Sequence, residues 1–193
     1  SLALALEDRV MKDDILIGDT PKAKRRKGRL KDLTPAGRLW KHSTLADVAG
    51  VVDPSEFFVF TIVRNPWDRA VSYYHWLQSQ RFQHPAVGLA QSLTFSEFIN
   101  HKAIMAGFQS QPYRSYVTDT DGVLRCNLFA RLEALEDDLR PLWDHLGFVC
   151  KVNRVNASDR ERDWRHYYND ADARIIATVC ADDIANFGYR FER

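Results

Sequence analysis

The pattern of apolar and polar positions predicts a chain in which strands alternate with helices. Residues 57–63 form a continuous run of mainly aromatic and β-branched type, the composition of a strand covered on both faces. Residues 66–80 follow with apolar side chains at helical spacing, and this spacing returns in residues 135–146 and 170–187. The alternation favours an α/β fold around a largely parallel central sheet flanked by helices.

Short motifs predict where these elements begin and end. Asn65 is a favourable N-cap and Pro66 fits the first helical position, while Asp68 adds negative charge to the first turn as a charged variant of the capping box. Thr94 opens a further helix through a Thr-x-x-Glu capping box. Gly147 is expected to end the helix of residues 135–146.

The first fifty residues contain no strong strand pattern. Residues 1–12 predict a helix, and residues 22–31 predict a loop with seven lysines and arginines. This basic segment is either a solvated surface loop or a docking patch for a polyanion. Ser43 or Thr44 is expected to cap a short helix that runs to Gly50.

Composition narrows the class of protein. An apolar content of 45% and a charged content of 27% are typical of a globular protein, and 193 residues suit a single domain. A net charge of +1 argues against a dedicated nucleic-acid binder, and no apolar run approaches the roughly 20 residues that span a bilayer. Three scattered cysteines without metal-ligand spacing favour a reducing, cytoplasmic compartment.

Arg64 lies at the carboxyl end of the predicted core strand, directly before a helix N-terminus. Anionic ligands bind at such positions because helix N–H groups and the macrodipole point there. Arg64 offers a planar charged fork and Ser72, two turns along the helix, offers a hydroxyl, so the two suit a terminal phosphate. The structural alternative is that Arg64 pairs with an acid such as Asp68 or Glu133, and that Ser72 only fills the helix.

The sequence TIVRNPWDRAVSYY, residues 61–74, resembles the 3′-phosphate-binding motif of sulfotransferases that use 3′-phosphoadenosine-5′-phosphosulfate (PAPS). In that family an arginine ends a core strand, and a serine eight residues later lies on the following helix. The resemblance implies that Arg64 and Ser72 hold the 3′-phosphate of PAPS and of its product 3′-phosphoadenosine-5′-phosphate (PAP). It also implies a P-loop-like, three-layer sulfotransferase fold.

Other segments carry the same resemblance over most of the chain. Residues 39–48, LWKHSTLADV, are similar to the segment of glycan O-sulfotransferases that holds the catalytic histidine, as in heparan sulfate 2-O-sulfotransferase. This implies that His42 is the general base, a role that suits an imidazole titrating near neutral pH. Without the resemblance, His42 is a structural or surface residue. Residues 127–148 and 155–191 are similar to the family's later strand, helices and closing loop.

The arginine-rich loop of residues 153–165 has two interpretations. Ser158 and Arg160 fold over the nucleotide, or the loop is a mobile part of the surface. The aromatic residues that follow are expected to anchor the loop to the core rather than to stack on adenine: Trp164, Tyr167 and Tyr168.

The family's first motif, a strand and a loop of the type Pro-Lys-Thr-Gly-Gly-Thr-Ser around the 5′-phosphosulfate, has no counterpart in this sequence. The family's next helix begins as SLALALE does, so Ser1 corresponds to the last residue of that loop and is expected to contact the cofactor. We therefore expect the sequence to be a fragment of a single sulfotransferase-like domain, and activity to require residues upstream of it.

Two functions follow from these patterns. The first is a PAPS-dependent O-sulfotransferase that needs no metal and acts on a hydroxyl of a carbohydrate or glycolipid, in the cytoplasm or peripherally at the inner membrane face. The second is a non-catalytic module that binds a nucleotide or polyanion through the basic segment and the arginine-rich loop. Binding of PAP and AMP separates the two functions. The sulfotransferase predicts tight binding of PAP and weak binding of AMP, whereas the polyanion-binding module predicts no preference and a steep dependence on salt.

Overall fold

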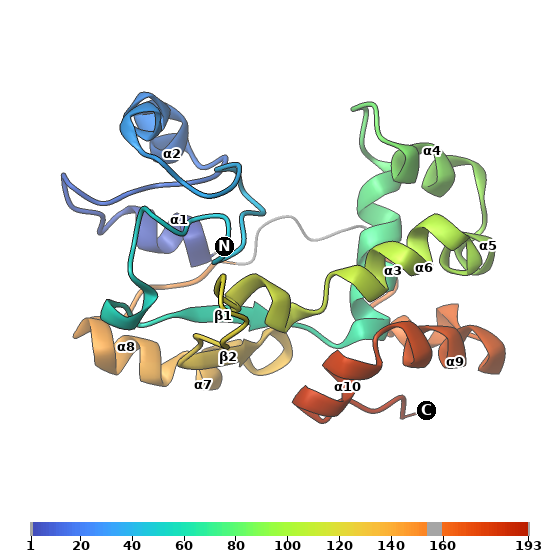
Figure 1. Cartoon of the computed structure of the whole chain (residues 1–193). Helices are drawn as coiled ribbons and strands as arrows, with labels where there is room; N and C mark the ends of the chain where they lie inside the picture. Colours follow the sequence, from blue (N-terminus) through green and yellow to red (C-terminus); the bar gives the residue numbers. More distant parts are fainter. Residues whose placement is uncertain (1, 154–159, 193) are drawn as a thin grey trace. The chain divides into compact units, whose positions relative to one another are not determined.

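The computed structural model describes residues 2–153 and 160–192. The chain is α/β, as expected, with about 52% of its residues helical and a small parallel sheet of two strands, β1 (Phe60–Val63) and β2 (Leu128–Arg131) (Figure 1). In the described ranges the sheet has no further strand, so the wider central sheet that we expected is not seen there. The strand β1 is also shorter than the predicted run of residues 57–63, and Phe57 at its start is 55% exposed.

Contacts divide the described chain into two compact units. The first unit comprises residues 2–62, 114–130 and 134–153, and the second comprises residues 63–113, 131–133 and 160–192. Each unit is treated by itself below. The expectation of a single domain stays a prediction.

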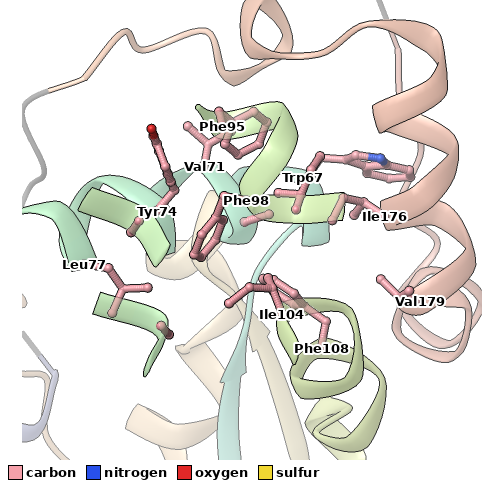
Figure 2. Packing of buried hydrophobic residues seen from close by; sticks show 14 of the residues in the cluster. Trp67, Val71, Tyr74, Leu77, Phe95, Phe98, Ile104, Phe108, Ile176 and Val179 are labelled. Carbon is pink, nitrogen blue, oxygen red and sulfur yellow. The ribbon is translucent and has the colours of Figure 1, made fainter. Parts of the chain in front are cut away.

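The second unit is built around α3 (Pro66–Gln78), whose apolar positions fall on one face. Ala70, Val71, Tyr74 and Leu77 are buried, a spacing of one and two helical turns that directs them into a common core. Figure 2 shows these side chains converging with those of neighbouring helices. The elements in contact with α3 are α4 (Pro85–Ser92), α5 (Phe95–Asn100), α9 (Asp170–Val179) and the 3₁₀ turn η5 (Trp164–Tyr167).

Helix boundaries in this unit follow their capping residues. Thr94 and Glu97 form the predicted capping box at the start of α5, with reciprocal side-chain to backbone hydrogen bonds. The predicted helix of residues 170–187 is divided at Cys180 into α9 and α10 (Ala181–Phe187). The remaining helix of the unit, α6 (Lys102–Ser110), packs against α5 and α9.

The first unit has a smaller core, in which α1 and α8 pack beside the sheet. Its buried side chains are Leu2, Ala130, Leu139, Leu142 and Trp143. The helix of residues 135–146 is present in two pieces and ends at Gly147, as predicted, with that residue in the left-handed conformation. The bounds of the helices in this unit are α1 (Leu2–Glu7), α2 (Pro21–Arg26), η1 (Lys27–Asp32), η2 (Pro54–Glu56), η3 (Tyr113–Val117), α7 (Leu135–Asp138) and α8 (Arg140–Leu146). The 3₁₀ turn η4 (Leu132–Ala134) has its first two residues in the second unit.

Two local predictions in the first unit are wrong. The basic segment is not a loop: α2 and η1 run through it, because Thr20 caps α2 and the Glu7 carboxylate accepts hydrogen bonds from the N–H groups of Lys22 and Ala23. The expected helix between Ser43 and Gly50 is replaced by turns. Backbone groups of that segment bond elsewhere, for example Leu45 N–H to the carbonyl of Tyr116 at 2.8 Å.

Candidate functional site

The loop between β1 and α3 is fixed by two acceptors. The Asn65 side chain accepts from the N–H groups of Trp67 at 3.0 Å and Asp68 at 3.4 Å, which confirms the predicted N-cap. The reciprocal half of the capping box does not come from Asp68. Instead the Glu133 carboxylate, from the turn after β2, accepts from the Asn65 N–H at 2.6 Å.

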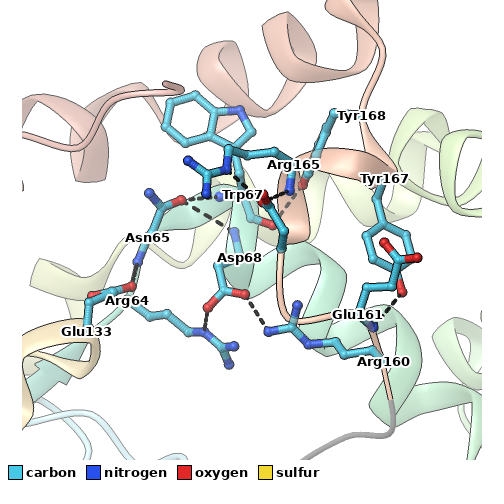
Figure 3. Close-up of polar contacts among 11 residues, drawn as sticks. Arg64, Asn65, Trp67, Asp68, Glu133, Arg160, Glu161, Arg165, Tyr167 and Tyr168 are labelled. Carbon is cyan, nitrogen blue, oxygen red and sulfur yellow. Dashed lines mark hydrogen bonds and ion pairs between the residues drawn. The ribbon is translucent and has the colours of Figure 1, made fainter. Parts of the chain in front are cut away.

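Arg64 forms an ion pair with Asp68, one turn along α3. Its Nε donates to the carboxylate at 2.7 Å, and the two side chains are 22% and 14% exposed (Figure 3). The structural alternative considered for Arg64 is therefore present. This contact uses Nε only, so Nη1 and Nη2 are left as donors for a ligand.

Arg160 approaches the same carboxylate from a distant part of the sequence. Its Nη2 donates to Oδ1 of Asp68, whereas Arg64 bonds to Oδ2. The Arg160 side chain is only 9% exposed, and its Nη1 is buried without a hydrogen-bond partner among the described residues. A buried guanidinium donor without a partner is unfavourable, since its hydration is lost and not replaced.

The aromatic residues after Arg160 anchor its segment to α3, as predicted. The Tyr168 hydroxyl donates to the carbonyl of Trp67 at 2.8 Å, and burial raises the pKa of Tyr168 far above its usual range. Trp164 stacks on Trp67 with ring centroids 6.3 Å apart. These contacts fix the polypeptide that carries Arg160 beside the first turn of α3 (Figure 3).

Ser72 lies on α3 two turns beyond Arg64 and is half-buried. No hydrogen bond of its hydroxyl to another described residue is recorded, so this hydroxyl remains available to a ligand. The structure thus brings Arg64, Asp68 and Arg160 together and places Ser72 on the same helix. Ser1 and Ser158, the other two predicted cofactor contacts, lie outside the described residues.

His42 belongs to the first unit, in a turn and not before a helix. The residue is exposed, and its ring packs edge-on against Trp40 with centroids 4.8 Å apart. Partial desolvation of the ring, followed by the nearby Lys41 charge, lowers the pKa of His42, and Asp19 opposes this. A lowered pKa keeps the imidazole neutral near pH 7, the form that accepts a proton.

The basic segment holds two of its arginines in structural contacts. Arg26 and Arg29 donate through Nη1 to backbone carbonyls of Met11 and Lys12, at 2.7 and 2.6 Å. The exposed cations Lys24, Arg25 and Lys27 stand in the last turn of α2 or just beyond it, where positive charge complements the helix dipole.

Among the described residues, no group of three or more His, Cys, Asp or Glu side chains is arranged to hold a metal ion. Within residues 2–153 and 160–192, none of the helices has the length and apolar content of a membrane span.

The sequence suggested Asp68 both as a helix-capping charge and, like Glu133, as a possible partner of Arg64. In the structure Asp68 is that partner, and Glu133 accepts from the Asn65 N–H instead. What the sequence did not reveal is that Asp68 also bonds to Arg160. The contact between Asp68 and Arg160 spans 92 residues, and no local pattern signals it.

Comparison of the chain with protein-family models, with curated proteins and with solved structures finds no match.

Proposed function

We propose that the protein is a PAPS-dependent sulfotransferase that moves a sulfuryl group to a hydroxyl of a carbohydrate or glycolipid. The observation that carries the proposal is the position of Arg64 and Ser72. Arg64 directly follows β1, Ser72 lies eight residues later on α3, and the surrounding sequence resembles the family's 3′-phosphate motif. A P-loop-like, three-layer sulfotransferase fold and a location in the cytoplasm, or peripherally at the inner membrane face, form part of the proposal.

The donors available in the second unit fit a phosphate group. Arg64 retains two terminal nitrogens, the buried Nη1 of Arg160 lacks a described partner, and Ser72 retains its hydroxyl. Guanidinium groups match the oxygens of a phosphate in a bidentate arrangement. These residues would hold the 3′-phosphate, and the cofactor supplies the sulfuryl group that is transferred.

In the proposed reaction the acceptor hydroxyl attacks the sulfur of PAPS, the sulfur–oxygen bond to the 5′-phosphate breaks, and PAP leaves. His42 takes the proton of the acceptor hydroxyl. The neutral state that its lowered pKa favours suits this role. Catalysis then rests on positioning and on electrostatic stabilisation rather than on a covalent enzyme intermediate.

The test is the contribution of the 3′-phosphate to binding. Arg64→Ala should weaken PAP binding by about 1.5–3 kcal/mol, the usual value of hydrogen bonds to charged groups, and should leave adenosine 5′-phosphosulfate nearly unaffected. Titration calorimetry with both ligands measures this difference. Arg81→Ala, an exposed position in the same unit, serves as the control. Equal losses of affinity for the two ligands would contradict the assignment of the 3′-phosphate to Arg64.

A second candidate function is a polyanion-binding module, favoured by the exposed cations Lys24, Arg25 and Lys27 on a folded helical segment. It predicts similar, weak binding of PAP and AMP, and a steep loss of affinity with salt. Reversing the charge of Lys24 and Arg25 would then abolish binding. Under the sulfotransferase proposal the same change leaves PAP affinity intact and, if the segment docks an anionic acceptor, raises the KM for that acceptor.

A further inference from the structure

Asp68 joins two arginines that belong to separate parts of the second unit. Its Oδ2 accepts from Nε of Arg64 at 2.7 Å and its Oδ1 accepts from Nη2 of Arg160. Arg64 precedes α3, whereas Arg160 precedes the anchored turn η5 (Figure 3). One carboxylate therefore fixes the orientation of both guanidinium groups, and the three side chains together carry a net charge of +1.

A structural ion pair explains only part of this arrangement. It accounts for Nε of Arg64 and Nη2 of Arg160, which face the carboxylate. It does not account for Nη1 of Arg160. This atom is buried, its side chain is only 9% exposed, and it has no hydrogen-bond partner among the described residues. Native proteins satisfy nearly all buried donors, so this exception at a charged side chain calls for an explanation, and a bound anion provides one.

Glu133, a second acid near this site, bonds to other groups and not to Arg64 or Arg160 among the described residues. Glu133 accepts from the Asn65 N–H through Oε1 and from the Tyr189 hydroxyl, at 3.3 Å, through Oε2. Burial and the charge of Glu133 raise the pKa of Tyr189 far above its usual range, so Tyr189 stays a hydroxyl donor. The helix N–H groups of Trp67 and Asp68 are likewise occupied by Asn65. An anion at this position would therefore bind to side-chain donors, of which the two arginines carry the charge.

We infer that Asp68 is the positioning residue of a two-arginine clamp, in which Arg64 and Arg160 bind one phosphomonoester dianion through the N–H groups that Asp68 leaves unused. The inference rests on the proposed function, which assigns the 3′-phosphate of PAP to Arg64. Asp68 touches the arginines and not the ligand. Its role is to hold two planar forks in the orientation that phosphate recognition requires.

Replacement of Asp68 by asparagine separates positioning from simple electrostatics. Asp68→Asn raises the local net charge from +1 to +2, so charge attraction alone predicts tighter binding of an anion. Loss of orientation predicts weaker binding. The sign of the change in affinity therefore decides whether Asp68 positions the arginines or only neutralises them.

The experiment is calorimetric titration of PAP, AMP and inorganic phosphate into the wild type, Asp68→Asn and Arg160→Gln. Both substitutions should weaken PAP about tenfold to hundredfold and leave AMP unchanged, the range expected for a lost charge-assisted hydrogen bond. Asp68→Glu, which restores the carboxylate, should recover part of the loss. Matched controls are Asp182→Asn and Arg162→Gln, which change exposed residues of the same types. Thermal unfolding of each variant reports whether it folds.

Each outcome bears on one of the two proposals. If Asp68→Asn binds PAP as tightly as the wild type or more tightly, the clamp is wrong, while a loss in Arg64→Ala leaves the sulfotransferase proposal standing. If the wild type does not prefer PAP to AMP but both substitutions weaken inorganic phosphate, the clamp stands and the sulfotransferase proposal fails. If wild-type protein binds none of the three probes, both are overturned.

Discussion

The two units of the chain bury their apolar side chains to different extents. Among the described residues, eighteen buried side chains form one cluster around α3 in the second unit, and five form the cluster of the first. The difference follows from sequence, since α3, α5 and α9 each present a full apolar face, whereas the first unit has short helices and long turns. Stability in the second unit therefore comes from packing, and the first depends more on individual polar contacts.

The candidate functional residues divide in the same way. In the second unit, the Asp68 side chain is 14% exposed and bonds to Arg64 and Arg160, whose side chains are 22% and 9% exposed. His42 in the first unit is exposed, and its ring packs edge-on against Trp40. Under the proposed function, anion recognition would fall to buried, mutually bonded side chains, and proton transfer to an exposed one.

This comparison shows what a recognition site requires of the fold. A phosphate is bound by several donors whose directions must be correct before the ligand arrives, because ordering them afterwards costs binding free energy. A general base needs one atom at hydrogen-bonding distance and a suitable pKa. In the proposed function the well-packed unit would meet the first requirement, and the exposed His42, whose pKa is lowered, would meet the second.

The largest expected effect is on the core of the second unit. Phe98 is fully buried in the cluster that Figure 2 shows. Phe98→Ala should lower the free energy of unfolding by about 3–5 kcal/mol, because a large cavity remains. Phe57→Ala in the first unit removes the same side chain from a position 55% exposed and should change stability by less than about 0.5 kcal/mol.

Urea denaturation of the two phenylalanine variants measures both values. A loss below about 1 kcal/mol in Phe98→Ala, outside the range for buried aromatic truncation, would show that the second unit is not held by this core. The contrast between the units would then disappear.

The next effect concerns His42 and sharpens the contrast in function. His42→Ala should lower kcat about 10²–10⁴-fold and leave PAP affinity unchanged, since the imidazole is proposed to act on the acceptor hydroxyl. Because its pKa is lowered, the acidic limb of the wild-type pH–rate profile should lie below the ordinary histidine value of 6.5 and be absent in the variant.

The measurement is PAP release from PAPS with a panel of sugar acceptors. His145→Ala is the control, since that exposed histidine of the same unit stacks on Phe58 and has no proposed role. Near-normal turnover in His42→Ala would assign the base elsewhere. Joint loss of PAP affinity and stability would make His42 a structural residue.

The parts of the fold that the sequence predicted are those determined by neighbouring residues. The N-cap at Asn65, the capping box at Thr94 and the stop at Gly147 each depend on a few consecutive side chains, and all three are present. The position of Arg64 before α3 follows from the same local rules.

The parts that the sequence did not predict depend on distant partners. The basic segment is helical because Glu7, fifteen residues earlier, accepts from the Lys22 N–H. The expected helix after Ser43 is lost to backbone bonds such as that of Leu45 to Tyr116. The bridge from Asp68 to Arg160 belongs to the same class, since propensity and periodicity describe neighbours and not long-range pairs.

The smallest expected effect tests a local contact of the well-packed second unit. Thr94 caps α5, so Thr94→Ala should lower the unfolding free energy by about 1 kcal/mol at neutral pH. Hydrogen bonds from the Thr94 backbone and side chain lower the pKa of Glu97 from its usual 4.5. A carboxylate with a lowered pKa stabilises the fold above its unfolded pKa and ceases to do so as the pH falls through the folded value. The difference in unfolding free energy between wild type and variant should therefore be complete above about pH 4.5 and shrink in more acidic solution.

Thr178→Ala, which removes an exposed hydroxyl bonded to the carbonyl of Arg174, is the matched control and should show no such pH dependence. If the Thr94→Ala difference is the same at pH 3 and pH 7, the bond from the Thr94 hydroxyl to the Glu97 carboxylate contributes nothing to the cap.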